Sequence, residues 1–317
     1  MSALTPGSDR VERENANVQA GGSLPFGFAN DSQALPRPTT TPSVPRRTHI
    51  TARRVALTRG RLTNLDHRIL EAVARLNVAS HKQLRELFYD DTPSAKRTAR
   101  ADLARLTNER ILGRLERRVG GVRAGSDGYI YALDVVGQRI AHPDRRRYRP
   151  PWTPRPTQVA HALAVTELYV TLTAAQAPGT TVRTFHAEPA AWRSYSGPGG
   201  GRAHLKPDAF VICDAEDFEY RYFVEVDRAT ESTTRILAKS RDYVRYWQSG
   251  REQATTGLFP LVVWVVPDAN RHAQLVSALS ELPPEHWSLF VVTTASEAWR
   301  LLWPDHPHQP TREEDRS

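Results

Sequence analysis

The sequence is poor in three residue types: it has one cysteine (Cys213), one methionine and only four lysines among its 43 basic side chains. A lone cysteine excludes a disulfide framework and a zinc site built from several thiolates. No run of eighteen apolar residues is present, which excludes a membrane-spanning helix, and we expect no membrane partner. The N-terminus lacks an apolar signal-peptide core, so we expect a cytoplasmic protein. A length of 317 residues allows two modest domains, or one domain with tails.

The basic charge is distributed unevenly along the chain. The formal net charge is +8 overall, with +4 in residues 1–60, +8 in residues 61–150 and −4 in residues 151–317. An asymmetry of this kind indicates that the basic segment meets a polyanion. The alternative is a solvated helical surface that is merely rich in arginine.

Two tails and a helical domain account for much of the chain. Residues 1–58 are rich in Pro, Ser, Thr and Gly and poor in apolar runs, which predicts a disordered tail, and residues 304–317 form a second tail. Residues 59–143 show three short helical patterns, for which Thr63 (or Asn64) and Ser80 are predicted N-caps of the first two. Strands at 112–119 and 129–133 follow, joined by a glycine-rich tip. Three short helices followed by a hairpin predict an N-terminal winged helix-turn-helix domain.

The basic residues of this domain lie where a winged helix contacts DNA. The third helix, at about 94–109, is the one expected to enter the major groove, and Lys96, Arg97 and Arg100 fall on or near one exposed face of it. The hairpin carries further cations suited to phosphate contacts: Arg114, Arg117, Arg118 and Arg123. We therefore expect double-stranded DNA as the partner. Binding of another protein, or formation of a homodimer, is the alternative.

A second domain is expected after an arginine- and proline-rich linker at residues 144–157, which would separate two independently cored units. Residues 158–303 alternate helical and strand patterns, which predicts an α/β domain with a mixed sheet flanked by helices. The expected helices are 158–176, 233–248, 270–282 and 295–303, and the expected strands are 181–187, 205–213, 220–226, 258–266 and 288–293.

Two carboxylates stand at matching places on neighbouring strands of this domain. Asp208 follows Pro207 on one strand, and Glu225 lies on the next strand, which is expected to run antiparallel to the first. Carboxylates brought together in this way can hold a hard divalent cation such as Mg²⁺ through oxygen ligands. A metal held there could activate water for phosphodiester hydrolysis.

These residues resemble the motif of the PD-(D/E)xK nuclease superfamily. Pro207-Asp208 matches its first element and Glu225 the start of its second, while Asp227 stands where the superfamily has a lysine. The resemblance implies a restriction-endonuclease-like fold for residues 158–303 and a Mg²⁺-dependent nuclease. In that site Asp208 and Glu225 bind the metal, and Lys239 on the following helix replaces the missing lysine.

The same resemblance leaves room for further roles. Glu167 on the domain's first helix takes the place of an additional acidic residue that some members use. The alternative is an inactive relative in which Asp227 pairs with Arg228 or Lys239. His161 is expected at a helix surface or core edge, with a place in the active site as the alternative, and Trp192 is expected in a lid or a surface loop.

A closer resemblance covers most of residues 60–300 and is to the replication-relaxation family. Its motifs are the His161-Ala162-Leu163-Ala164-Val165 helix, the Pro207-Asp208-Ala209 strand, the run from Glu225 to Glu231, and Lys239 with Tyr243. The resemblance implies a DNA-binding protein that acts in replication or relaxation of a plasmid or other mobile element, with replication or mobilisation proteins as partners. A Mg²⁺-dependent DNA nuclease or nickase, and a winged-helix transcription regulator, are the alternatives.

Overall fold

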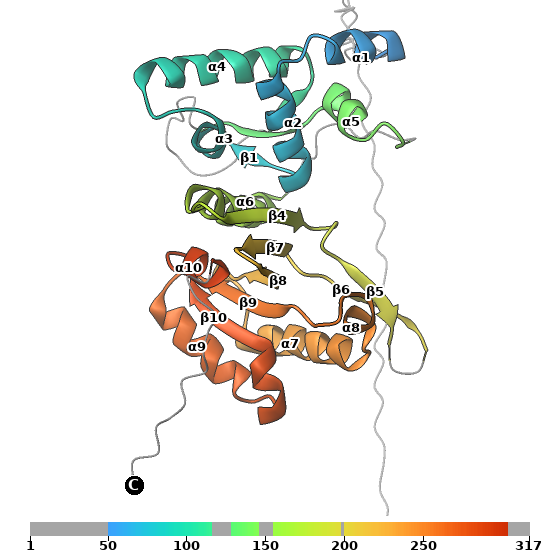
Figure 1. Cartoon of the computed structure of the whole chain (residues 1–317), viewed down its shortest axis with the longest axis vertical. Coiled ribbons are helices and arrows are strands. Elements are labelled where there is room, and N and C mark those ends of the chain that lie inside the picture. The colour runs from blue at the N-terminus through green and yellow to red at the C-terminus, as the bar shows by residue number, and fades with distance from the viewer. Residues whose placement is uncertain (1–49, 116–127, 146–154, 198–199, 304–317) are drawn as a thin grey trace, which may run out of the picture. The chain divides into compact units, whose positions relative to one another are not determined.

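The computed structural model describes residues 50–115, 128–145, 155–197 and 200–303 (Figure 1). All the described residues belong to one unit, within residues 49–317. The tail predicted at 304–317, most of the tail predicted at 1–58 and most of the linker lie outside the described residues. Arg117, Arg118 and Arg123 lie outside them too. Within the described part of the chain, no helix has the length and apolar composition needed to cross a bilayer.

The N-terminal region, residues 50–145, is mostly helical and carries a small sheet with the strand order β1-β3-β2. Its elements are α1 (Ala52–Arg59), α2 (Asn64–Leu76), β1 (Ala79–Ser80), α3 (His81–Phe88), α4 (Pro93–Asn108), β2 (Leu112–Leu115), β3 (Ile130–Leu133) and α5 (Val135–Ala141). The three helical patterns and both strands of the sequence prediction are present, and the winged-helix assignment stays a prediction.

Local signals explain where these helices begin. Thr63 and Ser80 each cap a helix through their side-chain oxygens, and Asp66 and Gln83 complete the two capping boxes. The helix α1 was not expected, because it lies inside the segment predicted to be disordered. It is capped by Thr51, and the neighbouring Ile50 is buried in the core of the N-terminal region.

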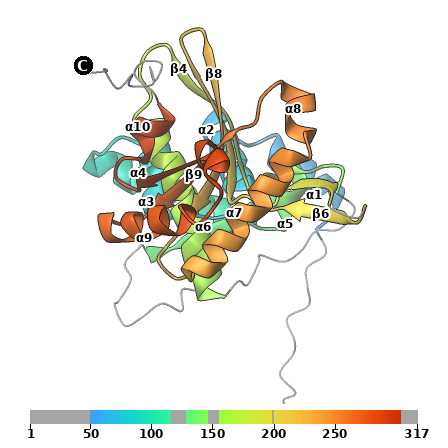
Figure 2. The same cartoon turned by 90° about the horizontal axis from the view of Figure 1, so that it is seen from below.

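The C-terminal region, residues 155–303, contains a five-stranded sheet with the order β10-β9-β8-β7-β4. Strand β7 pairs antiparallel with both β4 and β8, whereas β9 pairs parallel with both β8 and β10. The mixed sheet flanked by helices is therefore confirmed (Figure 2). The elements are α6 (Pro156–Ala174), β4 (Thr180–Ala187), β5 (Arg193–Ser196), β6 (Arg202–Leu205), β7 (Ala209–Ala215), β8 (Phe218–Val226), α7 (Thr233–Gln248), α8 (Arg251–Thr256), β9 (Leu261–Val266), α9 (Ala269–Leu279), the 3₁₀ helix η2 (Pro284–Leu289), β10 (Phe290–Thr294) and α10 (Ala298–Leu302).

One predicted strand is divided in the structure. The pattern at 205–213 predicts a single strand, but Leu205 ends β6, which pairs with β5, and Ala209 begins β7, which joins the main sheet. Pro207 lies between them and has no N–H to donate to a ladder, so pairing stops there. This break places Asp208 immediately before β7 rather than within a strand.

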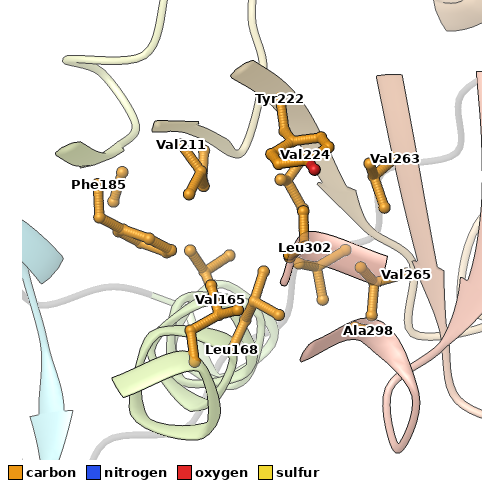
Figure 3. Packing of buried hydrophobic residues seen from close by; sticks show 14 of the residues in the cluster. Val165, Leu168, Phe185, Val211, Tyr222, Val224, Val263, Val265, Ala298 and Leu302 are labelled. Atoms are coloured by element: carbon orange, nitrogen blue, oxygen red, sulfur yellow. The ribbon is translucent and has the colours of Figure 1, made fainter. Parts of the chain in front are cut away.

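Each face of the sheet buries a different apolar cluster. On one face, Val165 and Leu168 of α6 and Leu302 of α10 pack against Val211 and Val224 of the sheet (Figure 3). On the other face, α7 and α9 pack against alternate residues of the same strands. Because neighbouring strand residues point to opposite faces, the C-terminal half of β8, from Tyr222 to Val226, is buried on both sides, and Glu225 is enclosed with it.

The N- and C-terminal regions share buried contacts. Ala72 and Leu76 of α2 belong to the same apolar cluster as α6 and the sheet. Thr166 of α6 donates to the carbonyl of Val78 at 2.8 Å, in a buried position. The expectation of two independently cored units therefore differs from the structure, because the C-terminal end of α2 has an apolar face that α6 covers.

Candidate functional site

A cluster of charged and polar side chains lies where β7 begins and β8 ends. Ala209 of β7 pairs with Val224 of β8, and this register sets Asp208 beside Glu225. From α7, Lys239 reaches both carboxylates and Tyr243 reaches Glu225. His161 reaches Asp208 from α6. We call these five residues the carboxylate cluster.

Every carboxylate oxygen of the cluster has a donor or a cation beside it. The two oxygens of Asp208 face the backbone N–H of Val226 at 2.8 Å and the Nε2 atom of His161 at 3.2 Å. Those of Glu225 accept hydrogen bonds from the Tyr243 hydroxyl, at 2.5 Å, and from the Lys239 ammonium. Lys239 Nζ also lies 3.6 Å from Asp208 Oδ1. A single ammonium thus stands between the two carboxylates.

Burial and pairing act in opposite directions on the acidic groups. Burial would raise the pKa of Asp208, but the hydrogen bond from His161 and the charge of Lys239 hold that pKa below its usual range. Glu225 is only 1% exposed, and its burial raises its pKa well above the usual value. The cluster therefore combines one carboxyl that stays ionised with one that binds a proton more readily.

The pKa values of both basic groups of the cluster are raised. Burial alone would lower the pKa of Lys239, but the charges of Glu225 and Asp208 raise it instead. The hydrogen bond to Asp208, together with the charges of Asp208 and Glu188, raises the pKa of His161 despite burial. Lys239 is therefore the charge that offsets the two carboxylates at neutral pH.

The cluster fits a magnesium ion in its donor chemistry. Mg²⁺ is commonly held by one or two carboxylates together with waters and substrate phosphates, and Asp208 and Glu225 supply such a pair. Lys239 now lies between these carboxylates, so a cation would have to displace its ammonium. Among the described residues, no group of three or more His, Cys, Asp or Glu side chains is arranged to hold a metal ion.

Two residues predicted for this site lie elsewhere. Asp227 accepts a hydrogen bond from Arg271 Nε of α9 at 2.5 Å, in a buried ion pair, rather than pairing with Arg228 or Lys239. Its strand ends at Val226, so the alternation that would set it beside Glu225 stops one residue earlier. Glu167 faces the N-terminal region, where Gln83 donates to it at 2.7 Å.

The predicted DNA-contacting residues of α4 differ in their surroundings. Arg97 and Arg100 are exposed, whereas Lys96 is half-buried and pairs with Asp91 at 2.7 Å. A further cation of α4, Arg105, bonds the buried Asp66 at 2.6 Å and so holds α4 against α2. In β2, the guanidinium of Arg114 lies 4.3 Å from the ring centre of Tyr129.

A pocket of about 790 Å³ opens beside the carboxylate cluster. Its walls come from α2, β3 and α5 of the N-terminal region, and from α6 and the turn after β4. His161 and Asp208 line it, while Lys239 and Glu225 do not. Trp192, predicted to lie in a lid or surface loop, is a wall residue.

The sequence predicted His161 at a helix surface or core edge. In the structure its imidazole instead contacts the carboxylate of Asp208. The signal that pointed to it was its place in the family motif, which also contains Lys239 and Tyr243. No local pattern around His161 indicates its partner, because the two residues are 47 positions apart and meet only when α6 packs on the sheet.

Comparison with known proteins identifies the family. The model of the family described as replication-relaxation matches residues 70–262, which is more than half of the chain. The matched segment runs from within α2 to β9 and includes the whole carboxylate cluster. No curated protein and no solved structure matches the chain. The chain belongs to the replication-relaxation family.

Proposed function

We propose that this protein binds double-stranded DNA through a winged helix formed by residues 59–143, and that it acts in replication or relaxation of a plasmid or other mobile element. The observation that carries the proposal is the outer face of α4, where Arg97 and Arg100 are exposed to solvent. Membership of the replication-relaxation family supports a role of this kind.

The position of α4 supports its use as a recognition helix. It follows α2 and α3 and precedes the β2–β3 pair, which is the element order of a winged helix. Its inner face is occupied by Ala99, Leu103 and Leu106, all buried. The arginines opposite this face are not needed for packing, so they remain available for phosphates and base edges.

The test is the salt dependence of duplex binding. Each phosphate neutralised by a cation contributes about 0.9 to the slope of log K against log salt concentration. We expect the Arg97→Ala/Arg100→Ala variant to bind a mixed-sequence duplex roughly tenfold more weakly at low salt, with a slope about 2 units shallower. Fluorescence anisotropy at several salt concentrations measures both quantities.

A matched control removes the same number of exposed arginines elsewhere. Arg241 of α7 and Arg300 of α10 are exposed, and the Arg241→Ala/Arg300→Ala variant has the same net charge as the α4 variant. We expect it to retain most of the duplex affinity. Equal losses in the two variants would show that only net charge matters and would overturn α4 as the recognition helix.

A second function is favoured by the meeting of Asp208, Glu225 and Lys239, the three residues expected in a Mg²⁺-dependent nuclease of restriction-endonuclease-like fold. Asp208 and Glu225 would hold the metal, which when bound supplies Lewis-acid chemistry for phosphodiester hydrolysis. Lys239 would withdraw from between the carboxylates and keep its proton, so that its charge could stabilise a phosphate.

Plasmid nicking with Mg²⁺ or Mn²⁺ tests this second function. We expect Asp208→Asn and Glu225→Gln to abolish nicking, and Asp242→Asn, which changes an acidic residue of α7 outside the cluster, to leave it intact. Nicking that survives both cluster substitutions, or a parent protein that never nicks, would contradict the nuclease. A footprint at a specific duplex site without nicking would instead favour a transcription regulator.

A further inference from the structure

The strands β5 and β6 form a two-stranded ribbon to one side of the five-stranded sheet (Figure 1). From Trp192 to Lys206 the chain carries three cations, Arg193, Arg202 and Lys206, and no acidic residue. The net charge of residues 151–317 is −4, so this ribbon is a basic segment within an acidic region. Charge of one sign gathered on a single element indicates a partner of the opposite sign.

The inner face of the ribbon holds it against the main sheet. Tyr195 and Leu205 are buried in the apolar cluster that also contains α7 and α9. The guanidinium of Arg193 lies 4.4 Å from the ring centre of Phe210 and pairs with the buried Glu252 at 3.2 Å. Arg193 is thus used in anchoring the ribbon, and the other two cations are not.

The outer face of the ribbon carries two hydroxyls and two basic side chains. Ser194 pairs with His204 across the two strands, and Ser196 pairs with Arg202. Because strand residues alternate between faces, these four side chains point away from the sheet, and both His204 and Arg202 are exposed. Within the described part of the chain, no carboxylate pairs with Arg202. This face therefore offers only donors and cations to a partner, apart from the hydroxyl oxygens.

Lys206 continues the basic surface toward the carboxylate cluster. Its ammonium lies 4.8 Å from the ring centre of Trp192, which is 40% exposed, and no carboxylate of the described residues pairs with it. Contact with an aromatic face leaves N–H groups of the ammonium free to donate. Asp208 follows Lys206 by two residues, so their Cα atoms are at most about 7 Å apart. An anion bound at Lys206 would therefore lie close to the cluster.

We infer that Arg202 and Lys206 of the β5–β6 ribbon bind backbone phosphates of duplex DNA. Charge complementarity selects this partner, because exposed cations beside hydroxyls, with no acidic side chain among them, match a phosphate backbone. The inference rests on the proposed function for the identity of the partner. It adds a second DNA contact, in the C-terminal region, to the one at α4, and it brings the duplex to the carboxylate cluster.

The test is the affinity of the full-length protein for two fluorescein-labelled duplexes of equal length and unrelated sequence, measured by anisotropy at several salt concentrations. We expect Arg202→Ala/Lys206→Ala to weaken binding roughly tenfold at low salt and to make the slope of log K against log salt about 2 units shallower. Because phosphates carry no sequence information, the loss should be equal on the two duplexes. Arg202→Lys/Lys206→Arg keeps both charges and should retain most of the affinity.

The matched control is Arg241→Ala/Arg300→Ala, which removes the same charge from exposed positions on α7 and α10. We expect this variant to keep most of its duplex affinity and its salt slope. Thermal unfolding of each variant verifies that it folds, and the ribbon variant should unfold near the temperature of the parent, because its two altered side chains are exposed.

Duplex affinity and salt slope that are unchanged in Arg202→Ala/Lys206→Ala would overturn the inference. An equal loss in the control variant would do so too, and so would a loss confined to one of the two duplexes, which would indicate contacts to bases. Failure of the proposed recognition helix has a different signature, because it appears as duplex affinity that Arg97→Ala/Arg100→Ala leaves intact. A parent protein that binds neither duplex would overturn both.

Discussion

The N-terminal and C-terminal regions use charge in opposite ways. On α4 of the N-terminal region, Arg97 and Arg100 are exposed to solvent. In the C-terminal region, Asp208 and Glu225 are buried and share Lys239. Exposed charges are screened and act mainly on partners, whereas buried charges interact strongly with one another and set the stability of the fold.

Two lysines make this contrast measurable within one chain. Lys82 of α3 lies near two carboxylates, Glu86 at 3.1 Å and Glu167 at 3.7 Å, and its side chain is 55% exposed. Lys239 of α7 also lies near two carboxylates, but its side chain is only 28% exposed. The two residues have similar partners and differ in their surroundings, so the cost of removing each one reports the effect of burial.

The largest effect is expected when this pair is compared directly. Lys239→Met should lower the free energy of unfolding by roughly 3 kcal/mol at pH 7, because it leaves two buried carboxyls without their cation. Lys82→Met should cost less than about 1 kcal/mol, as is typical of exposed ion pairs. Urea unfolding measures both values.

The pH dependence of the Lys239→Met variant gives a second readout. Burial raises the pKa of Glu225, and without Lys239 that carboxyl should bind a proton still more readily. The loss of stability should therefore be smaller at pH 5 than at pH 8. Equal losses of unfolding free energy for the two lysine variants at pH 7 would contradict the expectation that burial makes Lys239 the costlier residue to remove.

Elements marked by local signals were predictable from the sequence. The helix expected at 233–248 has those bounds in the structure, because Ser232 caps it and its apolar residues recur at helical spacing. The pairing of Asp208 and Glu225 on neighbouring strands was also predictable, since a hairpin between adjacent strands sets their register. These features depend on short stretches of chain.

Contacts between distant elements were not predictable. Arg271 lies 44 residues after Asp227, and nothing in either local sequence shows that they pair. The same holds for His161 and Asp208. The contact of α6 with the N-terminal region was likewise missed, because an apolar face of α2 does not reveal which element covers it. Such pairings are determined by tertiary packing.

A backbone contact gives the next largest effect and is confined to the N-terminal region. Gly137 of α5 lies so close to Ile111 that an added Cβ would overlap the Ile111 carbonyl. We expect Gly137→Ala to lower the free energy of unfolding by roughly 2 kcal/mol, although alanine ordinarily favours a helix. Gly60→Ala is the control, because its Cβ would meet only ordinary contacts and its φ is negative. An unchanged or raised stability for Gly137→Ala would contradict the close approach.

A smaller effect tests the pairing of His161 with Asp208. The pKa of His161 is raised, so its stabilising effect is complete below the ordinary histidine pKa and is lost as pH rises through the folded-state pKa. We expect His161→Gln to cost roughly 1 kcal/mol at pH 5.5, the value of a partly buried charge-assisted hydrogen bond, and less at pH 9.

A histidine with the opposite shift provides the control for this prediction. Burial lowers the pKa of His186 of β4, so protonation of that side chain opposes folding as the pH falls. His186→Gln should therefore become relatively more favourable at pH 5.5 than at pH 9. Chemical unfolding at the two pH values measures the free energy of unfolding of both variants. If that free energy changed with pH in the same direction in both variants, the opposite pKa shifts of His161 and His186 would be contradicted.

The smallest effect concerns the surface charge near α4. Asp91 pairs with Lys96, and the hydrogen bond from that lysine lowers the pKa of the Asp91 carboxyl, so it stays ionised next to the proposed DNA-binding face. Asp91→Asn should release Lys96 for phosphates and raise duplex affinity by about threefold at low salt. Asp90→Asn, which removes the same charge from a neighbouring residue with no described cation partner, should produce a smaller gain. Because exposed charges act through the solvent, both gains should disappear at high salt, whereas the cost of Lys239→Met should persist there. A gain from Asp91→Asn that survives high salt would mean that the exposed charges of α4 behave like the buried charges of the carboxylate cluster.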